Sequence, residues 1–184
     1  MKNSLVLAAL ILLPFYGGLA AQTTTAPTAL PTTAQKPLCL TDPGFTDFDF
    51  WLGRWDVEDV VAKQTAGTNI IQKINGGCAL LESWSGASGT SGTSLNHYDP
   101  IHKKWHQRWV SSGAYTIEIA GGLKEGSMFM EGTISYYATG ASFPFRGLWT
   151  PNPDGSVRQF FEQYAPKKKA WIRWFDSRYT KQKP

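Results

Sequence analysis

The chain has 184 residues, 42% of them hydrophobic and 14% aromatic, and a formal net charge of +4 at pH 7. This length and apolar content are sufficient for one domain with a buried core. The positive excess falls from +4 to +3 when Lys2 is removed with the leader described next, and an excess this small does not make a nucleic-acid-binding surface. We therefore expect one globular domain with no nucleic acid partner.

The first 21 residues have the three-part pattern of a secretory signal peptide. Lys2 supplies a positive start, residues 5–15 form an apolar core, and residues 18–21 end the pattern with mostly small side chains. A membrane anchor is the weaker alternative, because Pro14 interrupts the apolar run and the run is short for a bilayer. We predict that residues 1–21 are a signal peptide, that the protein is exported to the periplasm or secreted, and that no stable membrane anchor remains after processing.

A second segment, residues 22–37, is rich in Thr and Pro and has almost no large apolar side chains. Such a segment buries too little surface to offset the entropy lost on ordering, so it predicts a flexible linker. Residues 38–181 are then left as a single domain.

Two cysteines, Cys39 and Cys78, follow the predicted signal peptide. Exported proteins fold under oxidising conditions, so we expect a Cys39–Cys78 disulfide. It would close a loop of about 40 residues and stabilise the domain by about 2 to 4 kcal/mol. The alternative, a catalytic thiol, is less favoured because neither cysteine has a histidine nearby in the sequence.

Turn-forming residues interrupt the rest of the chain at nine places, and the intervening segments are rich in β-branched and aromatic residues. None of these segments has a long apolar pattern at helical spacing. The sequence thus predicts an all-β domain of about ten strands, and short hairpin connections favour an antiparallel up-and-down barrel, whose closure leaves no exposed edge strands. A β-sandwich is the alternative. Residues 43–51 are expected to form a short helical or turn-like lid at one barrel mouth.

Several motifs resemble those of a family of exported bacterial proteins of unknown function. The resemblance covers about residues 39–179 and is carried by FDFWLGRWDV (48–57), SLNHYDP (94–100), KWHQRWV (104–110), DGSVRQFFEQ (154–163) and WFDSRY (174–179). More remotely, the chain is similar to nitrobindin-like and other calycin barrels. The resemblance implies a calycin-like barrel with an internal pocket, and it implies no particular activity.

The hairpin SLNHYDPIHKKWHQRW (94–109) predicts one face of the pocket. If Asp99 pairs with Lys104 across the turn, alternation places aromatic and neutral polar side chains on one side of the sheet. That face is the less charged, so we expect it to point inward and to bind a ligand. The predicted ligand-binding residues of this face are Ser94, Asn96, Tyr98, Trp105, Gln107 and Trp109. The alternative is a buried structural network in which the polar members satisfy one another.

The same alternation gives weaker ligand-binding candidates, which are Glu82, Trp84, Arg146 and Arg158. Inward arginines would favour an acidic ligand, whereas on an outer face they would form ordinary cross-strand salt bridges. Glu82 and Glu162 would form a catalytic acid–base pair if both faced inward.

All three histidines, His97, His102 and His106, lie on the same hairpin. The register above puts His97 opposite His106 on the outer face, a weak candidate for a zinc or copper site because no supporting carboxylate is evident. The nitrobindin resemblance suggests haem, but those relatives place the haem-ligating histidine near the end of the chain. No histidine follows His106, so we expect neither haem nor another cofactor.

No nucleophile elbow, zinc-protease histidine pair or phosphate loop occurs in the sequence, which favours binding over catalysis. We expect an exported barrel that binds a small, largely apolar molecule in its interior. One alternative is a barrel enzyme, acid–base or hydrolytic, that acts on a hydrophobic or glycan-like substrate. Another is a structural envelope protein whose barrel is filled by its own side chains.

Overall fold

The computed structural model describes residues 36–183, so the predicted signal peptide and nearly all of the predicted linker lie outside the described residues. Four short 3-10 helices are η1 (Leu38–Leu40), η2 (Pro43–Thr46), η3 (Asp49–Trp51) and η4 (Asn75–Gly77). Ten strands follow the chain as β1 (Gly53–Asp59), β2 (Thr65–Ile74), β3 (Ala79–Gly86), β4 (Ser91–Asp99), β5 (Lys104–Ser111), β6 (Tyr115–Lys124), β7 (Ser127–Tyr136), β8 (Ser142–Pro151), β9 (Val157–Ala165) and β10 (Ala170–Lys181). No helix among the described residues is long and apolar enough to span a bilayer.

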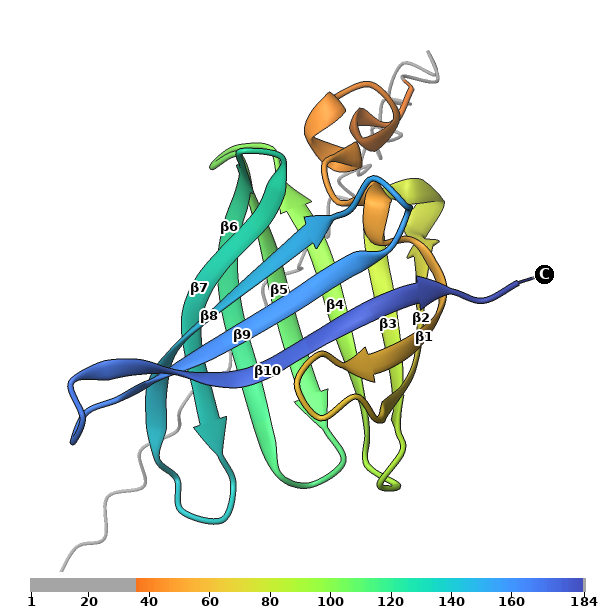
Figure 1. Ribbon diagram of the computed structural model, residues 1–184. Helices are drawn as coiled ribbons and strands as arrows, with labels where there is room; N and C mark the ends of the chain where they lie inside the picture. Colours follow the sequence, from red (N-terminus) through yellow and green to blue (C-terminus); the bar gives the residue numbers. More distant parts are fainter. Residues whose placement is uncertain (1–35, 184) are drawn as a thin grey trace, which may run out of the picture. The chain divides into compact units, whose positions relative to one another are not determined.

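The strands form a closed antiparallel barrel with up-and-down topology (Figure 1). Each strand pairs with its neighbours in sequence, and β1 pairs with β10, from Trp55 opposite Lys181 to Asp59 opposite Ser177. Every strand therefore has two partners, and the sheet has no free edge. The predicted barrel is confirmed, and the sandwich alternative is excluded.

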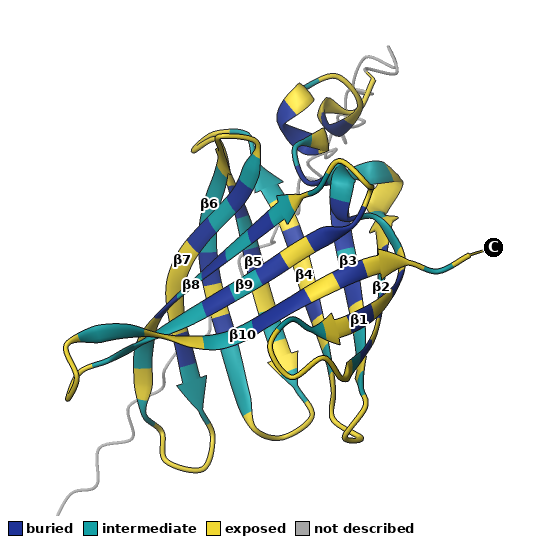
Figure 2. Cartoon of the chain, viewed as in Figure 1, coloured by how far each residue is buried: buried dark blue, intermediate teal, exposed yellow. Residues whose placement is uncertain are grey.

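Burial alternates along the strands, as Figure 2 shows. In β4, for example, Ser94 and Asn96 are buried while Leu95 and His97 are exposed. Successive side chains of a strand point to opposite faces, so the buried set is the one that faces the barrel interior.

A lid, residues 43–51, closes one end of the barrel. Within the lid, Phe48 and Trp51 are fully buried, and their rings stack at a centroid distance of 4.8 Å. Phe48 also packs in T-shaped geometry against Trp105 from β5 and Trp149 from β8, at centroid distances of 5.6 Å and 5.2 Å. The Trp105 indole Nε1 also donates a hydrogen bond of 3.0 Å to the Gly44 carbonyl oxygen. The lid therefore covers this mouth as expected, and it also fills this end of the interior with aromatic side chains.

A disulfide joins the lid region to the barrel wall. Cys39 in η1 is bonded to Cys78, which directly precedes β3, and their Cα atoms are 4.9 Å apart. The predicted pairing is thus present. An ion pair of 2.7 Å between Lys73 Nζ and Asp49 Oδ2 adds a second link between the lid and β2.

Candidate functional site: an aromatic cavity with a buried carboxyl group

A cavity of about 210 Å³ lies inside the barrel at the end opposite the lid. Much of its lining comes from the strand ends remote from the lid, such as Trp84 near the end of β3, Trp109 near the end of β5 and Trp174 near the start of β10. The residues that line it are Glu82, Trp84, Thr90, Gln107, Trp109, Tyr115, Ile117, Gln159, Phe161, Trp174, Phe175 and Tyr179. The barrel is therefore filled at one end and hollow at the other.

Aromatic rings dominate the cavity walls. Trp84 meets Phe175 edge-on at a centroid distance of 6.2 Å, and Tyr115 meets Trp174 in the same way at 5.1 Å. The Trp174 indole Nε1 donates to the Tyr136 hydroxyl at 3.1 Å. Edge-to-face contacts of this kind are favourable and hold the rings in defined orientations.

A bulge in β10 adds one aromatic ring to the lining. The pairing with β9 passes from Arg173 opposite Glu162 directly to Phe175 opposite Phe161, so Trp174 has no partner of its own. A bulge breaks the alternation of side chains along a strand. Two consecutive residues, Trp174 and Phe175, consequently both line the cavity.

The polar side of the cavity is a chain of hydrogen bonds that ends at Glu82. Gln107 Nε2 donates to Asn96 Oδ1 at 2.8 Å, and Asn96 Nδ2 donates to Ser94 Oγ at 2.8 Å. The Ser94 hydroxyl then donates to Glu82 Oε2 at 2.5 Å. From β2, Asn69 Nδ2 donates to Glu82 Oε1 at 2.7 Å. The predicted polar network therefore exists, and through Glu82 and Gln107 it also borders the cavity.

Burial changes the ionisation of the groups around this network. Burial raises the pKa of Glu82 to about 7, and the hydrogen bonds from Ser94 and Asn69 act in the opposite direction. Burial also raises the pKa of Tyr115 to about 12 and that of Tyr179 well above its ordinary value, so both phenols stay neutral at physiological pH. Glu82 is thus the group whose charge changes near pH 7.

Two further polar atoms of the lining residues are buried without a hydrogen-bond partner within residues 36–183. They are the donor Trp109 Nε1 and the acceptor Gln159 Oε1. Unsatisfied polar atoms are costly in a protein interior and mark positions where a bound molecule or ordered water supplies the partner.

The predicted register of the hairpin is confirmed, with Asp99 opposite Lys104, Asn96 opposite Gln107 and Ser94 opposite Trp109. This inward face is nevertheless divided between the two ends of the barrel. Gln107 and Trp109 line the cavity, whereas Trp105 and its cross-strand neighbour Tyr98 contact the lid. Ser94 and Asn96 are fully buried and reach the cavity only through Glu82 and Gln107. The weaker candidates Glu82 and Trp84 do line it.

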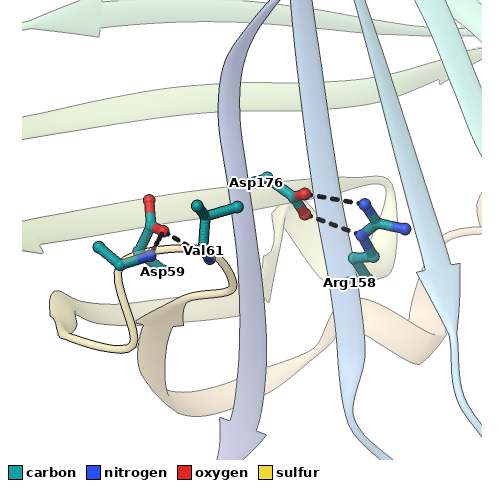
Figure 3. A network of polar contacts seen from close by, with 5 residues as sticks. Asp59, Val61, Arg158 and Asp176 are labelled. Atoms are coloured by element: carbon teal, nitrogen blue, oxygen red, sulfur yellow. Dashed lines mark hydrogen bonds and ion pairs between the residues drawn. The ribbon is translucent and has the colours of Figure 1, made fainter.

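The placement of Arg146 and Arg158 requires a correction, because both lie on the outer face. Arg158 forms a two-bond ion pair with Asp176, with both N–O distances 2.8 Å, as Figure 3 shows. Arg146 pairs with Glu162 at 2.7 Å and stacks on the Trp171 ring at 4.2 Å. Their strands point Trp149 and Phe161 inward, which directs the alternate residues outward. These arginines form the cross-strand salt bridges of the alternative interpretation.

The proposed Glu82–Glu162 acid–base pair is likewise not formed. Glu162 lies on the outer face beside Arg146, and Glu82 lies inside the barrel. The sheet separates the two carboxyl groups.

The histidines lie outside the barrel, in agreement with the predicted register. The rings of His97 and His106 are stacked with centroids 5.1 Å apart, while His102 Nδ1 lies 2.6 Å from Asp99 Oδ2. His102 is thus engaged in its own turn. Within residues 36–183, no three His, Cys, Asp or Glu side chains gather closely enough to hold a metal ion.

Most of the far wall of the cavity was not predicted from the sequence. The lining residues not predicted are Thr90, Tyr115, Ile117, Gln159, Phe161, Trp174, Phe175 and Tyr179. Alternation in β9 carried a signal, because Gln159 and Phe161 form the less charged of its two faces. The criterion applied to the 94–109 hairpin, that the less charged face points inward, selects this face as well.

The fold is thus a closed antiparallel barrel with an internal cavity. Comparison of the sequence with protein-family models and with curated proteins gives no match.

Proposed function

We propose that this protein binds one small, largely apolar molecule in the cavity at the hollow end of the barrel. The observation that carries the proposal is the cavity itself, with aromatic walls and a few convergent polar groups. A dry cavity of about 150 Å³ accommodates one benzene molecule. The volume of about 210 Å³ therefore suits one ring with a short side chain.

Two alternatives are less well supported by the same geometry. A filled structural barrel would need side chains throughout the interior, whereas only the end under the lid is packed in this way. An acid–base enzyme generally uses two groups, and the cavity lining holds one carboxyl group and no histidine.

The proposal also includes export and a calycin-like ancestry. The Cys39–Cys78 disulfide supports export, because such bonds persist in oxidising compartments. The antiparallel up-and-down barrel and its internal cavity are the features that the calycin resemblance leads one to expect.

Titration with an environment-sensitive apolar dye tests interior binding. We expect saturable binding that quenches tryptophan fluorescence, because Trp84, Trp109 and Trp174 line the cavity. Ile117→Trp fills the cavity from β6 and should abolish the signal, whereas Val110→Trp, on the exposed face of β5, should leave it unchanged. A dye signal that is not saturable, or that survives Ile117→Trp in folded protein, would contradict the proposal.

A further inference from the structure

We infer that the ligand is a small organic amine bound as a cation, with its ammonium group at Glu82 and its apolar part between the aromatic walls. This inference rests on the proposed function and specifies the chemical class of the molecule bound.

The charge balance of the lining favours a cation over an anion. Glu82 is the one lining residue that carries a charge near neutral pH, and Arg146 and Arg158 lie on the outer face. A buried carboxylate without a partner is costly, and a bound cation supplies the missing charge. A carboxylic acid ligand, by contrast, would place a second negative charge beside the first.

The hydrogen bonds around Glu82 are arranged for its ionised form. Every bond in the chain from Gln107 through Asn96 and Ser94 donates toward the carboxylate, and Asn69 donates to its other oxygen. Hydrogen bonds in such a chain polarise one another in the same direction. An ionised carboxylate has about four acceptor sites, so these two donors leave capacity for a ligand.

A second acceptor for the ligand lies among the buried polar atoms of the lining. Within residues 36–183, Gln159 Oε1 is a lining acceptor without a partner, and Trp109 Nε1 is a lining donor without one. An ammonium group brings up to three N–H donors and no acceptor. Its donors match Glu82 and Gln159.

The walls suit a cation as well as an apolar group. Indole, phenol and phenyl faces attract a cation placed within about 6 Å of the ring centroid, and indole does so most strongly. Three indoles, from Trp84, Trp109 and Trp174, line the cavity. A single carboxylate between aromatic walls therefore favours binding of an amine over binding of a neutral hydrocarbon.

Binding of a cation should be coupled to the release of a proton. The groups facing Glu82 are neutral: Asn69 from β2, Ser94 from β4, Tyr115 from β6 and Tyr179 from β10. The charge at the site is therefore set by Glu82. With its pKa at about 7, this carboxyl group is ionised in about one molecule in ten at pH 6 and about nine in ten at pH 8.

Isothermal titration with three probes of similar size tests the inference: 2-phenylethylamine, 2-phenylethanol and 3-phenylpropanoate. At pH 8 we expect the amine to bind at least tenfold more tightly than the alcohol, and the carboxylate not to bind. For the amine, affinity should rise about tenfold between pH 6 and pH 8. The dependence of the measured heat on the buffer should show proton release at pH 6.

Glu82→Gln keeps the shape of the side chain and removes its charge. We expect this variant to lose tenfold or more in affinity for the amine, to lose the pH dependence, and to retain its affinity for the alcohol. Glu162→Gln, on the outer face beside Arg146, is the matched control and should bind as the wild type does. If Glu82→Gln does not fold, the pH dependence and proton release of the wild type still decide the question.

The outcomes separate this inference from the proposed function. If the alcohol or the carboxylate binds as tightly as the amine, the cation assignment is wrong while interior binding stands. An affinity for the amine that changes neither with pH nor with Glu82→Gln would likewise contradict the cation assignment. If neither the probes nor the dye binds, both proposals fail.

Discussion

At the scale of single residues, the chemistry of the cavity depends on Glu82. Its side chain is only 4% exposed, yet it carries an ionisable group into an interior that is otherwise aromatic. Four neutral hydrogen-bonding side chains, Asn69, Ser94, Asn96 and Gln107, support it from β2, β4 and β5. Such a group costs stability when it is ionised and is retained where its charge is used.

This cost predicts how the stability of the unliganded protein depends on pH. The folded state holds the proton of Glu82 more tightly than the unfolded state, because the pKa is about 7 against an ordinary 4.5. The stabilisation that protonation of Glu82 gives to the folded state is therefore fully present below pH 4.5 and is lost as pH rises through 7. Relative to Glu82→Gln, we expect the wild-type free energy of unfolding to fall by about 2 to 3 kcal/mol between pH 5 and pH 8. Urea denaturation of both proteins measures this, and parallel pH profiles would contradict it.

The residues of the site differ in how far the sequence could predict them. The turn between Asp99 and Lys104 fixes the pairing of the hairpin, and from that assumed pairing alternation gave the two faces. Alternation also placed Glu82 with Trp84 and Arg158 with Glu162, but alternation alone does not tell which face of a strand points inward. The charge of the two faces indicates the direction in β9, whereas in β3 the inward face is the one that carries the charged Glu82.

At the scale of elements, the walls depend on local exceptions to regular strand geometry. The bulge in β10 turns Trp174 into the cavity beside Phe175. No glycine or proline marks the bulge in the segment WIRWFDSRY, and the sequence therefore did not predict it. In β4, Gly92 is a second exception, because the ring of Trp109 occupies the space where its side chain would be.

This close approach predicts that Gly92→Ala displaces the Trp109 ring. We expect the free energy of unfolding to fall by about 1 to 3 kcal/mol, as for other overpacked interiors. Affinity for 2-phenylethylamine should fall with it, because the indole forms part of the cavity wall. Gly122→Ala is the control, since a Cβ added at Gly122 in β6 meets no atom within 4 Å. Urea denaturation and calorimetric titration measure both effects, and equal behaviour of the two variants would show that the Trp109 ring tolerates the added methyl group.

At the scale of the whole molecule, the two ends of the barrel have different roles. The lid end contains the stacked Phe48 and Trp51 rings and the disulfide, whereas the opposite end contains the cavity. The number of strands and the closed barrel were predictable, because nine turn segments and the cost of exposed edges leave few arrangements. The division between a filled and a hollow end was not, since it arises when a segment preceding β1 inserts its aromatic rings between distant strands.

Because the disulfide and the cavity lie at opposite ends, we expect loss of the disulfide to lower stability without changing ligand affinity. Replacing both cysteines with serine frees a loop that spans a sequence separation of 39 residues, and we expect the free energy of unfolding to fall by about 2 to 4 kcal/mol. Because Cys78 directly precedes β3 at the lid end, affinity for 2-phenylethylamine should remain within about twofold of the wild-type value under conditions where the variant is folded.

Urea denaturation and calorimetric titration give the two quantities, and thiol titration of denatured, exported wild-type protein should detect no free thiol. Reactive thiols in that sample would show that the bond does not form in the exported protein. A large loss of affinity in folded variant protein would instead show that the lid controls the cavity from the opposite end of the barrel.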